Sequence, residues 1–133
     1  MARIVSIESQ DLPFRCSCSN GLHTWYADEP EHNNGGDTAP SPGELLLSAI
    51  GTCGVVTLRM YANRKQWPVE KIILTLSLEE IKGGPGGVFH RVHQHLELEG
   101  PLDEEQKSRM ISLLPKCPVS RLVTGRVEIV YKS

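Results

Sequence analysis

Apolar positions along the chain change their spacing, and the changes mark the expected strands and helices. Near the N-terminus, stretches rich in β-branched, aromatic and cysteine residues lie at 3–7, 14–19 and 22–27. The last two flank Asn20-Gly21, a dipeptide typical of tight hairpin turns. These stretches predict an antiparallel β meander. The segment 28–40, rich in polar residues, glycine and proline, is expected to be a flexible surface loop.

The most apolar segment follows a strong helix-start signal. Ser41 can cap the helix, Pro42 suits its first position, and Glu44, three residues after Ser41, completes a capping box. The pattern predicts a helix from here to about Arg64. Its apolar residues occupy nearly every face, which is typical of a buried helix. We therefore expect it to pack on a sheet with one face and on another subunit with a second.

The rest of the chain carries signals for a hairpin, a shorter helix and a last strand. Alternating apolar residues predict strands over 71–78 and 89–98, which a glycine-rich turn joins as an antiparallel pair. Asp103 is expected to cap a helix that Pro115 stops. Alternation over 126–131 predicts a final strand.

Length, charge and composition exclude several classes of protein. A chain of 133 residues and 14.7 kDa is expected to form a single domain over 1–133 without disulfides or metals to stabilise it. The net charge is −2 and the basic residues are scattered, so no nucleic-acid surface is indicated. We see no signal-peptide pattern and no uninterrupted apolar run of roughly 18 residues, so we expect a cytoplasmic protein without membrane insertion.

Four cysteines carry the candidate chemistry. In a reducing compartment they are expected to be buried apolar side chains or reactive thiols, and not a disulfide framework. Cys53 lies in the long apolar helix, where a packed core side chain is the alternative to a reactive thiol. Cys117 precedes Pro118, the expected first residue of a helical turn, whose N–H groups would favour a thiolate. A helix cap or a core thiol is the alternative for Cys117.

Other metal-ligating residue types form two incomplete sets. Cys16 and Cys18 would point to one face of a strand, but no second cysteine pair completes a tetrahedral site, so we expect structural thiols. His93 and His95 would share the solvated face of their strand. Two histidines alone do not make a metal site. No metal centre is therefore expected.

Three stretches form a recognisable order: 35–53 (GGDTAPSPGELLLSAIGTC), 60–62 (MYA) and 116–120 (KCPVS). Together they resemble the OsmC/Ohr family, the osmotically inducible and organic hydroperoxide resistance proteins. The resemblance covers essentially the whole chain. It implies an α+β fold in which antiparallel sheets pack on a long buried central helix. It also implies an intertwined homodimer with active sites near the subunit interface.

The same resemblance implies a mechanism. Cys53 is similar to the family's peroxidatic cysteine, whose thiolate attacks an organic hydroperoxide, releases an alcohol and becomes a sulfenic acid. Cys117 is similar to the resolving cysteine, which forms a disulfide that an external dithiol then reduces. No metal, flavin or other cofactor is required. The implied activity is a thiol-dependent peroxidase of the oxidative stress response.

One position departs from the family's pattern. In the hydroperoxide resistance branch the catalytic glutamate directly follows the motif's proline, where this chain has Gly43 and carries Glu44 one place later. Glu44 is therefore the candidate for the glutamate that assists the Cys53 thiolate. The resemblance also implies an arginine from an early segment, for which Arg15 is the candidate because Arg3 lies too near the terminus. The departure makes the chain more similar to the OsmC-like branch. It leaves two further possibilities: a non-catalytic redox-sensing or ligand-binding dimer, and a fold whose thiols are core residues.

Overall fold

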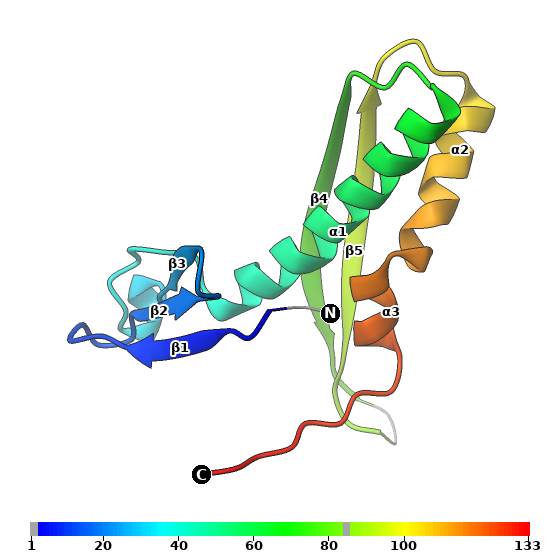
Figure 1. The fold of residues 1–133 in the computed structure, drawn as a ribbon. Helices are drawn as coiled ribbons and strands as arrows, with labels where there is room; N and C mark the ends of the chain where they lie inside the picture. Colours follow the sequence, from blue (N-terminus) through cyan, green and yellow to red (C-terminus); the bar gives the residue numbers. More distant parts are fainter. Residues whose placement is uncertain (1–2, 84–85) are drawn as a thin grey trace. The chain divides into compact units, whose positions relative to one another are not determined.

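The computed structural model describes residues 3–83 and 86–133, and the chain divides into two compact units (Figure 1). The units are Met1–Leu46 and Leu47–Ser133. The first contains a three-stranded antiparallel sheet, and the second contains a two-stranded antiparallel sheet with helices. The predicted α+β class is therefore confirmed.

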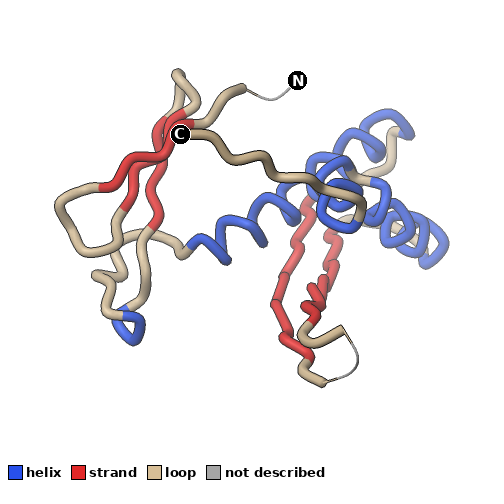
Figure 2. Tube along the Cα trace, turned by 90° about the horizontal axis from the view of Figure 1, so that it is seen from below, coloured by secondary structure: helices blue, strands red, loops and turns tan. Residues whose placement is uncertain are grey.

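The first unit is the predicted β meander. Its elements are β1 (Ser6–Ser9), β2 (Cys16–Ser19), β3 (Thr24–Ala27) and the 3-10 turn η1 (Glu31–Asn33), with the strands in the order β1-β2-β3 (Figure 2). Asn20 closes the turn between β2 and β3, because its side chain accepts hydrogen bonds from the N–H groups of Leu22 and His23 at 3.0 and 2.7 Å. Gly21 supplies the positive φ of 89° that this turn requires. The first strand begins at Ser6, later than predicted.

The segment 28–40 is organised by its own hydrogen bonds, whereas the sequence predicted a flexible loop. The N–H of Asp28 donates to the carbonyl of Pro40 at 3.0 Å and closes the base of the segment. The Asp28 side chain is only 2% exposed. It accepts hydrogen bonds from the N–H groups of Glu29 and Thr38 and from the Thr38 hydroxyl. A polar composition did not reveal that one buried carboxylate orders the segment.

The second unit packs helices on a long hairpin. Its elements are β4 (Lys71–Ile81), β5 (Phe89–Glu99), α2 (Glu104–Leu113), the 3-10 turn η2 (Leu114–Lys116), α3 (Pro118–Thr124) and most of the long helix α1 (Pro42–Lys65). β4 and β5 pair in antiparallel register from Lys71↔Glu99 to Ile81↔Phe89. Residues 84 and 85 of the predicted glycine-rich turn lie outside the described residues.

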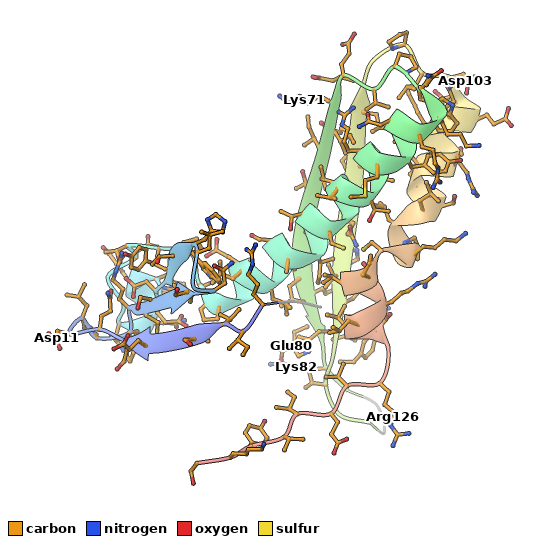
Figure 3. The ribbon with its side chains drawn as sticks, viewed as in Figure 1. Asp11, Lys71, Glu80, Lys82, Asp103 and Arg126 are labelled. Carbon is orange, nitrogen blue, oxygen red and sulfur yellow. The ribbon has the colours of Figure 1, made fainter. Side chains whose placement is uncertain are left out.

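Both predicted capping boxes are present. Ser41 and Glu44 exchange hydrogen bonds of 3.0 and 3.2 Å at the start of α1. Asp103, labelled in Figure 3, does the same with Gln106 at the start of α2, at 2.9 and 2.7 Å. Each box satisfies backbone N–H groups that a helix leaves unpaired at its first turn. These local signals therefore set where both helices begin.

The core of the second unit lies where α1 and the segment from α2 to η2 meet the hairpin. Its buried residues are Leu58, Ala62, Val69, Met110, Leu113 and Leu114. Leu74 and Leu96 pack against this cluster from the hairpin. α1 buries one face in this way, but Val56 and Met60 on it are exposed. Burial of α1 on a further side, by a second subunit, stays a prediction.

α1 also corrects an expectation about membrane segments. By length and composition it could cross a membrane, with a mean hydropathy of 1.5 over its most apolar stretch, of which 28% is buried within the chain. No uninterrupted apolar run of that length is present, because Ser48 and Thr52 interrupt this segment with small polar residues. A core helix of a soluble protein meets the same criterion, so this is a weak indication of a membrane span.

The predicted final strand at 126–131 is wrong for the single chain. After α3, residues 125–133 have no regular secondary structure and are exposed; Figure 3 labels Arg126 in this segment. A strand needs a neighbour that accepts and donates its backbone hydrogen bonds, and among the described residues no strand pairs with this segment. The alternating pattern is present, but its partner is not.

Candidate active site

Two glycines next to Cys53 allow α1 to pack closely against β4. Gly51 and Gly54 flank Cys53 on α1, and both are buried. A Cβ at Gly51 would lie 2.9 Å from Leu76 Cδ1, and one at Gly54 would lie 3.0 Å from Leu74 Cδ1. The helix backbone therefore packs directly against the leucines of β4. Cys53 is held beside this contact with its side chain half-buried.

Cys117 occupies the N-cap of α3, as the Cys-Pro dipeptide predicted. Its backbone is extended, with φ −70° and ψ 147°, and Pro118 is the first helical residue. The Cys117 carbonyl accepts the first helical hydrogen bond, from the N–H of Arg121 at 3.0 Å. The residue is 1% exposed. Its sulfur is thus held at the beginning of a helix and shielded from water.

The surroundings of Cys117 favour its thiolate. Burial raises the pKa of Cys117, but hydrogen bonding from the Ser120 side chain and backbone and from the Cys53 thiol outweighs burial and holds the pKa below its usual value. The Sγ of Cys117 lies 3.0 Å from the Oγ of Ser120. The Val119 N–H acts in the same direction.

The fold brings the two candidate cysteines together. Cys53 and Cys117 are 64 residues apart in the sequence, yet the Cys53 side chain is near enough to help lower the pKa of Cys117. Both are free thiols in this structure. A pair of adjacent thiols, one of them favoured as a thiolate, has the composition needed for disulfide chemistry. The individual roles of Cys53 and Cys117 stay predictions.

Cys53 lines an open groove of about 710 Å³ along α1. Most of the wall is apolar, with Val56 and Met60 from α1 and Pro118 and Val119 from α3. Cys117 does not line the groove. A molecule in the groove would therefore meet the sulfur of Cys53 first.

A cluster of cations surrounds Tyr61. This residue lines the same groove, one helical turn after Thr57 on α1. Arg109 Nε donates to Tyr61 Oη at 3.2 Å, and this hydrogen bond lowers the pKa of Tyr61. Arg64 and Lys65 lie 5.3 and 5.8 Å from the centre of the Tyr61 ring. Of these three cations, Arg64 also lines the groove. The sequence did not reveal the cluster, because Arg109 lies on α2 and Tyr61 lies on α1.

Ser120 is the other residue that sequence analysis missed. It belongs to the KCPVS stretch on which the resemblance rests, and it stands three residues after Cys117. Residues with that spacing face each other across a helix N-terminus. The signal was therefore present in the sequence, since Cys117 was expected to precede a helical turn.

Glu44 and Arg15 have well-defined contacts in the first unit. Glu44 closes the capping box, and the hydrogen bond from the Ser41 backbone lowers its pKa. Arg15 Nη1 donates to the hydroxyl and the carbonyl of Thr38, at 2.7 and 3.2 Å. Arg15 also lies 4.3 Å from the centre of the Tyr26 ring. The proposed roles of Glu44 and Arg15 at Cys53 stay predictions.

The two incomplete ligand sets, Cys16 with Cys18 and His93 with His95, have their own surroundings. His93 contacts Glu79 at 3.0 Å and His95 lies 3.6 Å from Glu97, on the exposed face of the hairpin. Cys18 is buried in the sheet of the first unit. Within residues 3–83 and 86–133, no group of three or more His, Cys, Asp or Glu residues could hold a metal ion.

Comparison with known sequences decides the family. A profile of the family described as OsmC-like protein matches residues 35–132. The chain belongs to the OsmC-like family. This stretch includes both Cys53 and Cys117, so the resemblance is confirmed over the residues that carry the candidate site. A search of curated proteins found no match.

Solved OsmC-like structures share the fold. The OsmC-like protein from Mycoplasma pneumoniae matches with a TM-score of 0.79 at 19% identity, covering 94% of this chain and 89% of that one. An organic hydroperoxide resistance protein OsmC from Legionella pneumophila gives 0.70 at 18%, covering 94% and 90%. A putative organic hydroperoxide resistance protein from Vibrio cholerae, with captopril bound in one of its active sites, gives 0.69 at 19%, covering 94% and 87%. At such identities the likeness concerns the fold.

Proposed function

We propose that this OsmC-like protein is a thiol-dependent peroxidase that reduces organic hydroperoxides. The observation that carries the proposal is the arrangement of two thiols: Cys53 lines an apolar groove, and its side chain helps to lower the pKa of the shielded Cys117 thiol. An apolar groove suits the organic part of a hydroperoxide. Two of the similar solved structures are described as organic hydroperoxide resistance proteins, which favours the same substrate class.

The first step takes place at Cys53. Its thiolate attacks the terminal oxygen of the hydroperoxide, the O–O bond breaks, and the leaving alkoxide takes a proton from water to become an alcohol. Cys53 becomes a sulfenic acid, so the sulfur is oxidised and the peroxide is reduced. A substrate bound in the groove reaches Cys53 and not Cys117, because only Cys53 lines the groove.

The second step joins the two sulfurs. The Cys117 thiolate attacks the sulfur of the Cys53 sulfenic acid, an S–S bond forms, and the hydroxide that leaves takes a proton to become water. An external dithiol then reduces the disulfide and restores both thiols. The chemistry uses only these cysteines and the dithiol, without a metal or an organic cofactor.

A homodimer in the cytoplasm is part of the same proposal. The apolar side chains of Val56 and Met60 are exposed on α1, and the segment 125–133 extends without a partner in the single chain. A second copy would bury such surfaces and give the last segment a neighbour. The dimer is supported by these surfaces and by the resemblance.

The deciding experiment follows the fate of each sulfur. The protein is treated with one equivalent of cumene hydroperoxide and analysed by intact mass and by peptide mapping without reduction. The wild type should form a disulfide between Cys53 and Cys117, and Cys117→Ser should hold a sulfenic acid on Cys53. Cys53→Ser should form neither. Cys16→Ser and Cys18→Ser serve as matched controls and should behave as wild type; unmodified Cys53 in the wild type would refute the proposal.

A second function, a redox sensor, is favoured by one observation. Gly43 stands where the hydroperoxide resistance branch carries its catalytic glutamate. A sensor would oxidise once and change conformation, whereas an enzyme would cycle. Steady consumption of cumene hydroperoxide in excess dithiothreitol identifies the enzyme, and a single stoichiometric oxidation identifies the sensor.

A further inference from the structure

Ser120 makes a close polar contact with the Cys117 sulfur. Its Oγ lies 3.0 Å from Cys117 Sγ, and both residues are buried. The carbonyl of Ser120 accepts a hydrogen bond from the Thr124 hydroxyl at 2.7 Å, one turn further along α3. The Ser120 hydroxyl is therefore presented to the sulfur from a fixed backbone. Burial excludes water that could otherwise replace this contact.

A hydroxyl can bond to Cys117 in either protonation state. It accepts from the S–H of a thiol, and it donates to the sulfur of a thiolate. A thiolate has no proton to donate, so its hydrogen bond requires a donor such as this hydroxyl. Hydrogen bonds to charged groups are stronger than those between neutral groups, so the hydroxyl favours the thiolate.

We propose that Ser120 is a positioning residue for the disulfide-forming step, which rests on the proposed peroxidase function. Its hydroxyl holds the Cys117 sulfur beside Cys53 and donates to the Cys117 thiolate from which the attack starts. In that step the S–S bond forms and the S–O bond of the Cys53 sulfenic acid breaks. The sulfenic sulfur is reduced, the Cys117 sulfur is oxidised, and hydroxide leaves as water after taking a proton.

The other ionisable groups near Cys117 do not replace this hydroxyl. Cys53 faces it from α1, and its thiol also lowers the pKa of Cys117. In the sulfenic acid this S–H is gone, because the sulfur now carries the oxygen. Lys116 and Arg121 flank Cys117 in sequence but are exposed, so water screens their charges. The contribution of Ser120 therefore matters most after Cys53 has been oxidised.

The test compares Ser120→Thr with Ser120→Val, which have nearly the same shape and differ by a hydroxyl in place of a methyl group. Ser120→Ala is added because it keeps the smaller volume. Ser112→Ala is the matched control, since it removes a hydroxyl that bonds to the Arg109 carbonyl in α2. The Cys117 titration is followed through the Cβ chemical shift in reduced protein labelled with [3-¹³C]cysteine. Sulfenic acid and disulfide formation are timed by rapid quench after one equivalent of cumene hydroperoxide.

Ser120→Val and Ser120→Ala should raise the pKa of Cys117 and slow disulfide formation roughly tenfold at neutral pH, with sulfenic acid formation unchanged. Ser120→Thr and Ser112→Ala should behave as wild type. The inference is overturned if Cys117 titrates and closes the disulfide as in the wild type when the hydroxyl is absent. The titration needs no peroxide, so it decides the role of Ser120 even if Cys53 never forms a sulfenic acid and the proposed function fails.

Discussion

Gly54 on α1 packs against Leu114 in η2, and a Cβ on Gly54 would lie 3.1 Å from Leu114 Cδ2. Gly54 directly follows Cys53, and Leu114 precedes Cys117 by three residues. The contact therefore joins the two segments that carry the thiols. A small residue at this point is what allows α1 and η2 to approach, so the spacing of the sulfurs depends on a residue without chemistry of its own.

Gly54→Val should destabilise the protein and slow disulfide formation. Its side chain would meet Leu74 on one side and Leu114 on the other, so the helix cannot avoid both. Overpacking of this kind costs about 1–3 kcal/mol of the free energy of unfolding. Urea unfolding measures the change. Gly43→Ala is the control, because a Cβ there meets only Ser41 Oγ, at 4.0 Å. An unchanged free energy of unfolding in Gly54→Val would contradict the packing argument.

The rate of disulfide formation should rise with pH and level off earlier than for an ordinary thiol. The pKa of Cys117 lies below its usual value, chiefly because the Ser120 hydroxyl and backbone outweigh burial. The thiolate is the attacking form, so the rate follows its fraction and is half-maximal below about pH 8.5, the ordinary pKa of cysteine. Rapid quench over a pH series, starting from protein with oxidised Cys53, gives the profile. A half-maximal rate at or above that pH would show that the Cys117 thiolate is not favoured.

Local signals explain most of what the sequence predicted correctly. The capping boxes at Ser41 and Asp103 each involve residues three positions apart, and Cys117 was placed at a helix start by the proline after it. The hairpin of β4 and β5 followed from alternating apolar residues. Such features depend on neighbours in the sequence, so a pattern is enough to find them.

Features that depend on distant residues were not predictable from the residues alone. The closeness of Cys53 to Cys117 came only from the family resemblance, since no pattern measures the distance between two helices. The burial of Asp28 requires Thr38, ten residues later, to supply its partners. The expected strand at 126–131 failed for the opposite reason: its own pattern is correct, but pairing depends on a neighbour that the single chain does not provide.

Asp28→Asn should destabilise the protein at neutral pH and lose this effect in acid. Hydrogen bonds from the Thr38 hydroxyl and backbone lower the pKa of Asp28. A lowered pKa in the folded state contributes stability above the ordinary aspartate value of about 3.9, and this is lost as the pH falls through the folded pKa. Urea midpoints of Asp28→Asn and wild type should therefore differ at pH 7 and converge in acid. Asp37→Asn, in the same segment but exposed, is the control; a gap that persists in acid would contradict the argument.

Gly43→Glu should increase the rate at which hydroperoxide oxidises Cys53. It restores the glutamate that the hydroperoxide resistance branch carries directly after the motif's proline, and a side chain at Gly43 has room. A hydrogen bond between this charged glutamate and the group that assists the Cys53 thiolate would change the rate roughly tenfold. Gly43→Gln is the matched control, because it has the same shape without the charge. The second-order rate constant with cumene hydroperoxide decides. Equal rates for the two variants would mean that Glu44 already supplies the function or that no glutamate is used.

The last segment should hold the proposed dimer together. Val127, Ile129 and Tyr131 share one face of the alternating pattern, opposite Glu128 and Val130, and they are 54%, 67% and 85% exposed in the single chain. Burying one such side chain contributes about 1.5–3 kcal/mol, so losing two should raise the dimer dissociation constant at least roughly 100-fold.

The double substitution Val127→Lys with Ile129→Lys tests this prediction, because it places charges on the apolar face of the segment and leaves its length unchanged. Glu128→Lys reverses a charge on the opposite face and is the control. Sedimentation velocity over a concentration series should show the double variant dissociating at concentrations where the control and the wild type remain dimers. If all three sediment alike, the segment does not hold the dimer together, and the dimer must rest on the exposed face of α1.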